Sequence, residues 1–303
     1  MVHLVVDSDD EDLELPSGEE DACILVDDPD ECMLGESSDE DLELPPDGEH
    51  VDMMMAALGV PAWLDGTLRD DFAEIFCPGR ICPWIRAFGL RASMAIDILV
   101  DPQNHDLRSP LNRTNILLEL ERRRPRVVLS CAPCTWYSEL NRLWNQKRMS
   151  SDKAKDKEKE ATVLFDFGML VGRRQHLRKD MYVHEHPWRA SSWKLESTKE
   201  LASEQGFKTV DFDQCRVGLS SPFSRIPIKK RTRLLTNLNT IQMTFGCMKC
   251  ACTNLHPLNG DMVKHFHIQG SEGGVRISTH CASYPPMFCR IVAECVAAHC
   301  LKT

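Results

Sequence analysis

The first 52 residues contain no lysine or arginine, although they hold 21 of the 46 acidic residues of the chain. The rest of the chain holds 25 acidic and 36 basic residues, so a tail with a charge of −21 precedes a body with a charge of +11. Such a tail buries too little apolar surface to offset the entropy cost of ordering it, and its like charges repel. We therefore expect residues 1–52 to be disordered and the basic body to fold and to suit a polyanionic partner.

Long apolar runs are also missing from the sequence. No segment approaches the roughly 20 apolar residues that a membrane span needs, and the acidic N-terminus lacks the basic-then-apolar order of a signal peptide. We expect an intracellular protein with no membrane contact. Fourteen cysteines in a chain of 303 residues then favour reduced thiols, metal ligands or catalysis over a disulfide framework.

Two short aliphatic runs interrupt the acidic tail, at Leu4–Val6 and Ile24–Val26, and each is followed by acidic residues. An extended run of this kind can add a strand to the sheet edge of a partner while its acids meet a basic rim. Both runs resemble SUMO-interacting motifs, which implies SUMO or basic proteins as partners of the tail. The alternative is a solvated acidic tail in which the aliphatic residues have no role.

Strand-like and helix-like segments alternate along the body. Strands are expected at 71–76, 92–100, 126–130, 181–184, 208–212 and 233–236, and helices at 84–90, 115–124, 151–175, 196–204 and 286–300. This alternation predicts an α/β fold with a mostly parallel sheet and helices on both faces. Ligands of such folds bind at the carboxyl ends of the strands.

The most specific motif follows the strand at 126–130. The chain reads Cys131-Ala132-Pro133-Cys134 and continues through Thr135-Trp136-Tyr137 to Ser138. Cytosine-C5 DNA methyltransferases carry a strand followed by Pro-Pro-Cys, two variable residues, an aromatic residue and Ser, and this segment resembles them in the same register. The alternative is a buried structural cysteine after a strand.

The resemblance implies a class I, Rossmann-like methyltransferase domain that uses S-adenosylmethionine, with Cys134 as its nucleophile. Cytosine C5 is a poor nucleophile, and a thiolate that adds to C6 activates it toward a methyl donor. The thiolate must be exposed at a strand end, where a flipped base can reach it.

Two further blocks follow in the order that the family has. The segment 182–187 is a strand that ends in Glu and Pro, and Glu185 lies where the family has a glutamate that contacts the N3 and N4 edge of cytosine, so the resemblance implies an acid with a raised pKa. Arg231 and Arg233 resemble the spaced arginines that contact the base and the phosphate backbone. The alternative for the arginines is a nuclear-localisation-like basic run or solvated charge.

The cofactor positions implied by the resemblance lie earlier in the chain. They are Glu74, Phe76 and Gly79 at the first strand and turn, Asp97 after the second strand, Asp106, and Pro133 beside the nucleophile. Asp97 would accept the ribose hydroxyls, as acids at this place do in nucleotide-binding α/β folds. The family has a glycine-rich loop where this chain has little more than Gly79, and close backbone approach to a cofactor favours glycine.

Two functions follow from this mixture of matches and departures. One is an active DNA (cytosine-5) methyltransferase, similar to phage and retroelement-associated relatives and expected in the nucleus. The other is a catalytically silent nucleic-acid-binding module of a mobile element that keeps the fold. In either case we expect the methyltransferase-like domain over residues 53–240.

Residues 241–303 form a Cys/His-rich region and a final helix expected to pack on the same domain. Its potential zinc ligands are Cys247, Cys250, Cys252 and His256. Thiolates and imidazoles suit Zn²⁺ in a tetrahedral structural site. The alternative is a set of reduced cysteines and histidines in a loop-rich subdomain.

Overall fold

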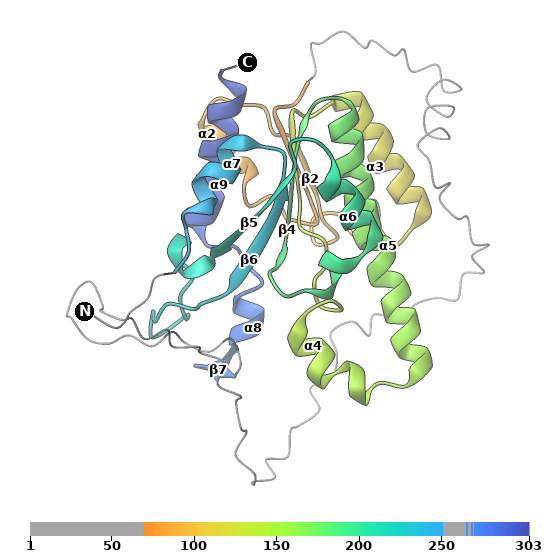
Figure 1. Cartoon of the computed structure of the whole chain (residues 1–303), viewed down its shortest axis with the longest axis vertical. Helices are drawn as coiled ribbons and strands as arrows, with labels where there is room; N and C mark the ends of the chain where they lie inside the picture. The colour runs from red at the N-terminus through yellow and green to blue at the C-terminus, as the bar shows by residue number, and fades with distance from the viewer. Residues whose placement is uncertain (1–68, 251–264, 266–267, 269, 303) are drawn as a thin grey trace, which may run out of the picture. The chain divides into compact units, whose positions relative to one another are not determined.

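The computed structural model describes residues 69–250, 265, 268 and 270–302 (Figure 1). The disorder predicted for residues 1–52 and the two aliphatic motifs of the tail lie outside the described residues.

A six-stranded sheet forms the centre of the described part, in the order β2–β1–β3–β4–β6–β5. The first four strands pair in parallel, whereas β6 is antiparallel to both of its neighbours. The strands are β1 (Phe72–Ile75), β2 (Met94–Ile96), β3 (Val127–Ser130), β4 (Met181–Pro187), β5 (Lys208–Asp213) and β6 (Arg231–Thr236). A short hairpin of β7 (Ser271–Glu272) and β8 (Val275–Arg276) lies apart from this sheet.

Helices cover both faces of the sheet (Figure 1). One face carries α2 (Cys82–Ala87), α7 (Asn239–Gly246) and α9 (Pro286–Cys300), and the other α3 (Pro110–Arg123), α5 (Ser151–Leu177) and α6 (Glu196–Ser203). The shorter helices are α4 (Glu139–Trp144), α8 (Ile277–His280), η2 (Gln146–Arg148), η3 (Ser191–Lys194) and η4 (Gln214–Val217). Every helix among the described residues is too short or too polar to serve as a membrane span.

The predicted α/β class, with a mostly parallel sheet between two helical layers, is confirmed. Local sequence signals explain several element boundaries. Ser109 caps α3 by accepting a hydrogen bond from the Asn112 amide, Pro110 opens the helix, and Arg124 ends it in a left-handed conformation before Pro125. The final helix begins and ends where the sequence predicted, at Pro286 and Cys300.

Some details differ from the sequence-based expectation. The sequence offers Ser151 or Asp152 as the N-cap of the helix at 151–175, but the N-cap of α5 is Ser150, and no side chain accepts a hydrogen bond there. Strand β6 runs antiparallel because the chain returns from β5 to insert between β5 and β4. Helices α4, α7 and α8 were not expected.

Helix α5 approaches the sheet closely through Gly168 and Gly172, one turn apart on the same helix face. A Cβ atom at Gly172 would lie 2.7 Å from both the Leu201 side chain and the Tyr182 ring. The Tyr182 ring is fully buried, and its hydroxyl donates a 2.6 Å hydrogen bond to the Gly168 carbonyl, so the ring cannot withdraw.

We predict that Gly172→Ala destabilises the protein by up to about 2 kcal/mol net, because overpacking a filled interface costs about 1–3 kcal/mol. The effect opposes the gain of about 1 kcal/mol in helix propensity that alanine brings. Urea unfolding measures it, with Lys155→Ala at an exposed position of the same helix as the control. A Gly172→Ala variant as stable as the control would show that the helix can shift away from the sheet.

Candidate active site

Cys134 and Glu185 lie near the carboxyl ends of β3 and β4, close enough for the charge of Glu185 to act on the Cys134 thiol. Cys134 lies in the turn between β3 and α4, where its carbonyl accepts hydrogen bonds from the amides of Tyr137 (3.1 Å) and Ser138 (2.9 Å). The Ser138 hydroxyl then caps α4 by accepting from the Asn141 amide at 3.2 Å. This strand–turn–helix geometry holds a half-buried thiol at the edge of the sheet.

Glu185 is buried in β4, and its two carboxylate oxygens have different surroundings. Oε2 accepts a 2.5 Å hydrogen bond from the hydroxyl of Tyr284, which precedes α9. Oε1 is equally buried and has no hydrogen-bond partner among the described residues. A buried polar atom left without a partner costs about 1–3 kcal/mol, so this oxygen is available to a ligand.

Lys230 provides the nearby positive charge, from the residue that directly precedes β6. Its ammonium group donates a 2.9 Å hydrogen bond to the Cys281 carbonyl. Burial raises the pKa of the Cys134 thiol, and the charge of Lys230 opposes this rise. Burial likewise raises the pKa of Glu185, against the charge of Lys230 and the Tyr284 hydrogen bond. The site therefore favours a neutral carboxyl group beside a thiol whose pKa stays above its usual value, although the Lys230 charge offsets part of the rise.

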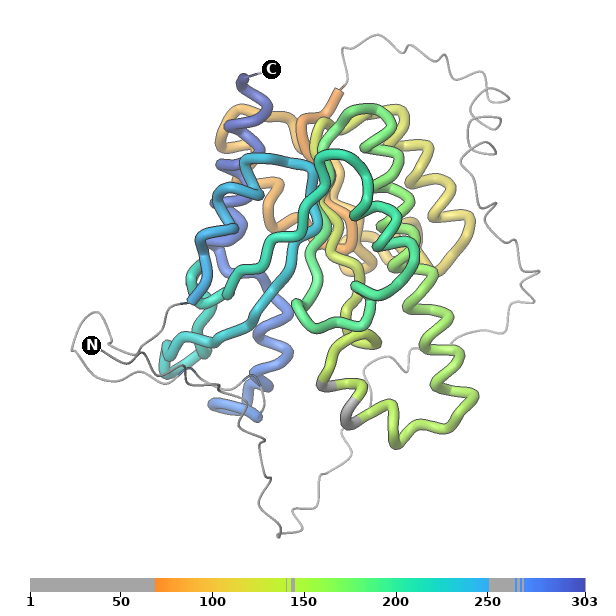
Figure 2. The backbone as a smooth tube through the Cα atoms, in the orientation of Figure 1, coloured from red at the N-terminus to blue at the C-terminus, as the bar shows by residue number. Residues whose placement is uncertain are grey.

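Helices α4 and α8 lie at this same end of the sheet (Figure 1), and the chain around Tyr284 runs between α8 and α9. The backbone trace shows that segments distant in sequence converge there (Figure 2). Hydrogen bonds from Lys230 to Cys281 and from Tyr284 to Glu185 join the segment after α8 to the β6 and β4 side. The site thus depends on chain contributed after residue 240 as well as on the first strands.

Arg231 and Arg233 do not lie with Cys134 and Glu185. Glu185 pairs with Leu234 and His186 with Arg233, so both arginines project from the sheet face opposite to that of Glu185. Arg231 pairs with Asp213 (Nε to Oδ1, 3.0 Å) and Arg233 with Asp211 (2.6 Å).

Each guanidinium group also lies over an indole ring. The Cζ atoms of Arg231 and Arg233 lie 4.9 Å and 5.6 Å from the ring centroids of Trp188 and Trp193. Ion pairs and cation–π contacts of this kind hold both side chains in place on their own face of the sheet. Sequence reasoning selected the arginines and missed Lys230 and Tyr284. Side chains alternate between the two faces of a strand, so the sequence could have placed Lys230 on the face of Glu185 only if the register of β6 against β4 had been known.

The predicted cofactor residues gather near the carboxyl ends of β1 and β2. Phe76 directly follows β1 and has a φ of 59°, a conformation that costs a non-glycine residue about 1–3 kcal/mol and that occurs often at functional sites. Gly79 follows with a φ of 76°, and a Cβ there would lie 3.1 Å from Ala95 of β2. Asp97 comes directly after β2, is half-buried, and accepts a 2.8 Å hydrogen bond from the Leu99 amide.

Three other predicted cofactor residues have partners or positions that bear on this role. Glu74 is buried, and its Oε1 accepts hydrogen bonds from the Ile81 and Cys82 amides at the start of α2, while its Oε2 lacks a partner among the described residues. Asp106 binds the Arg108 side chain through both oxygens. Pro133 is exposed beside Cys134.

The predicted metal ligands are only partly brought together. Cys250 groups with Cys215 and His265, and the donor atoms of the three lie within 4.8 Å of one another, so they could hold a metal ion. Cys247 is exposed, and its thiol contacts the Met243 and Thr244 carbonyls instead. Cys252 and His256 lie outside the described residues.

Comparison with known proteins adds no family assignment. Neither a scan against protein-family models nor a search of curated proteins gives a match to this chain.

Proposed function

We propose that the chain is an S-adenosylmethionine-dependent cytosine-C5 methyltransferase of the Rossmann-like class I type, acting on nucleic acid. The observation that supports this most strongly is the buried Glu185, whose Oε1 has no hydrogen-bond partner in the part of the chain that the structure describes, close enough to Cys134 for its charge to act on the thiol. The mostly parallel sheet, with the antiparallel β6 between β4 and β5, fits this fold. Cys134 and Glu185 lie near the carboxyl ends of parallel strands, where α/β folds bind their ligands.

The proposed chemistry uses the surroundings of each side chain. Tyr284 donates to Oε2 of Glu185, so the proton of the neutral carboxyl group belongs on Oε1, where it can be given to N3 of a flipped cytosine. The Lys230 charge helps to form the Cys134 thiolate, which adds to C6 and makes C5 nucleophilic. S-adenosylmethionine would supply the methyl group to C5 and leave as S-adenosylhomocysteine. Loss of the C5 proton to solvent would then break the C6–S bond and release the thiolate, and N3 would return its proton to Glu185.

The surroundings of Asp97 fit the adenosine part of this cofactor. Its carboxylate lies at the end of β2, where the ribose hydroxyls are bound in related folds. The next three residues, Ile98, Leu99 and Val100, are 40%, 80% and 50% exposed and offer apolar surface to a purine. Phe76 adds a strained backbone at the end of β1.

A nucleic-acid substrate is supported by the chain that follows Cys134. Arg142 of α4 and Lys147 and Arg148 of η2 are exposed, and Lys and Arg in such a position contact phosphates. The first ten residues of α5 contain four lysines and four acidic residues, so their net charge is close to zero. DNA is the polyanion that the resemblance favours.

A second function is favoured by the engagement of Glu74 as the cap of α2 and of Asp106 with Arg108. These contacts occupy groups that would otherwise serve the cofactor. They support a nucleic-acid-binding module that keeps the fold and lacks methyl transfer.

Calorimetry with the full chain and S-adenosylmethionine separates the two functions. Binding is expected for the wild type and is expected to weaken at least tenfold in Asp97→Asn, because an amide loses the charged acceptor for the ribose hydroxyls. Asp101→Asn, at a half-buried carboxylate of the same loop that accepts hydrogen bonds from Gln103 and Asn104, serves as the matched control and should bind as the wild type does, because the amide oxygen can still accept from both backbone amides.

Transfer of a labelled methyl group to DNA completes the test. It should fall to background in Cys134→Ser and persist in Cys247→Ser, a substitution at an exposed thiol. Folded wild-type protein that binds DNA but no S-adenosylmethionine would overturn the enzymatic proposal in favour of the silent module.

A further inference from the structure

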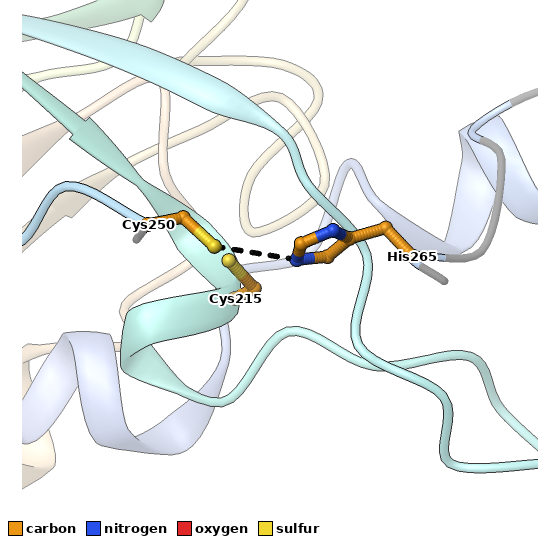
Figure 3. A group of neighbouring side chains, drawn as sticks. All are labelled: Cys215, Cys250 and His265. Carbon is orange, nitrogen blue, oxygen red and sulfur yellow. Dashed lines mark hydrogen bonds between the residues drawn. The ribbon is translucent and has the colours of Figure 1, made fainter. Parts of the chain in front are cut away.

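Two cysteines and one histidine from separate parts of the chain meet beside the end of β5 (Figure 3). Cys215 belongs to η4, directly after β5, and Cys250 follows α7. The third residue, His265, presents its Nε2 atom 3.4 Å from the Cys250 sulfur. All three side chains are half-buried, which shields a bound ion from bulk water without closing the site.

The geometry points to a zinc site with Cys215, Cys250 and His265 as ligands. Bond lengths of about 2.3 Å for Zn–S and about 2.0–2.1 Å for Zn–N put a sulfur and a nitrogen about 3.6 Å apart on one tetrahedral ion. The observed 3.4 Å between Cys250 and His265 is close to this value. Two sulfurs on the same ion would be about 3.8 Å apart, so Cys215 needs a shift of at most about 1 Å.

The chemistry of the donors selects the metal. Two thiolates and an imidazole are soft to borderline ligands that favour zinc over the oxygen-seeking Mg²⁺ and Ca²⁺. A tetrahedral ion leaves a fourth position for water or for another residue of the chain. Cys250 is disulfide-bonded in the structure, so the site takes up metal in the reduced protein.

Asp213 orients Cys250 through a hydrogen bond to its backbone. Its Oδ2 accepts a 2.7 Å hydrogen bond from the Cys250 amide, and the same carboxylate pairs with Arg231 of β6. Such outer contacts orient metal ligands. A bound ion would link the chain after α7 to the end of β5. This place lies beside Arg231 and Arg233, which stack on Trp188 and Trp193.

The test measures zinc in the full chain, purified with a phosphine reductant present throughout. We expect about one zinc per chain by mass spectrometry of the metal. Cys215→Ser and His265→Asn should each lower the affinity for zinc by at least tenfold in competition with a chromophoric chelator. Cys247→Ser removes an exposed thiol outside the group and is expected to keep wild-type affinity.

Cobalt substitution of the wild type gives a second measurement that needs no variant to fold. Co²⁺ in this site should show thiolate charge-transfer absorption together with the d–d bands of tetrahedral geometry. The inference is overturned if the reduced protein binds no zinc, or if Cys215→Ser and His265→Asn bind it as tightly as the wild type. A Cys247→Ser variant that loses the metal would also overturn it and would assign the site to a different set of cysteines.

Discussion

Replacing Glu185 by glutamine is expected to lower the rate of methyl transfer by about 10²–10⁴-fold, the range that a positioned general acid contributes. Glutamine preserves the shape of the side chain and can still accept the hydrogen bond from Tyr284, but it cannot give a proton to N3 of cytosine. Single-turnover methylation of DNA measures the chemical step directly. Glu196→Gln, an exposed glutamate at the start of α6, is the matched control.

The pH dependence of the same reaction distinguishes acid catalysis from a structural role. Burial raises the pKa of Glu185, and the reactive form is the neutral carboxyl group. The rate should therefore fall as the pH rises through that raised pKa. The Glu185→Gln variant should lose this limb of the profile. A variant that keeps both the wild-type rate and the wild-type profile would remove Glu185 from the mechanism.

The stability of the protein should change with Glu185 in a defined direction. A carboxyl group whose folded-state pKa exceeds its unfolded value stabilises the fold below the unfolded pKa, near 4.5, and loses this contribution as the pH rises through the folded pKa. Glutamine does not titrate, so the variant lacks that decline. The contribution of Glu185 to the free energy of unfolding falls as the pH rises, whereas that of the two buried histidines of the same strand grows, so the two contributions oppose each other.

Much of the fold was predictable because local signals and tertiary packing agree. The apolar segment at 127–130 is fully buried in β3, and Pro125 with the left-handed Arg124 separates it from α3. The last helix was predicted at 286–300, and its buried face packs in the core shared with α2 and α7.

The details that decide the site were not predictable in the same way. Whether Lys230 or Arg231 shares a face with Glu185 depends on the register of β6 against β4, and a shift of one residue exchanges the faces. Tyr284 reaches Glu185 from 99 positions further along the chain, and no local pattern marks that contact. The metal group likewise joins Cys215, which no spacing rule connects to Cys250.

Two histidines of β4 lie on the face opposite to Glu185, in an aromatic cluster. The His184 ring packs 5.1 Å from Phe165 and 5.8 Å from Trp193, and His186 stacks on His184 at 5.6 Å, measured between ring centroids. His186 Nδ1 lies 2.7 Å from the Ser192 hydroxyl, whereas neither His184 nitrogen has a hydrogen-bond partner among the described residues. Both side chains are fully buried. Burial lowers the pKa of His184 well below its usual value and lowers the pKa of His186 to about 3.

These histidines are expected to make the protein lose about 4 kcal/mol of unfolding free energy between pH 8 and pH 5. Each takes up a proton near pH 6.5 in the unfolded chain but stays neutral in the fold, and each pH unit below 6.5 then costs about 1.4 kcal/mol per histidine. The contribution is fully present above pH 6.5 and declines as the pH falls, before most carboxylates titrate. A loss of this size is a large part of a typical total of about 5–15 kcal/mol.

Urea unfolding at half-unit steps from pH 8 to pH 5, in the Glu185→Gln background, measures this slope without the opposing contribution of the buried carboxyl group. The slope should reach at least two protons taken up on unfolding, because burial also lowers the pKa values of His265 and His299, and His184→Leu should reduce it by about one proton, since leucine fills the apolar site and cannot titrate. Imidazole NMR signals of the folded protein supply an independent reading. If both histidines titrate near pH 6.5 in the native state, their burial imposes no penalty on charge, and the acid sensitivity must come from another group.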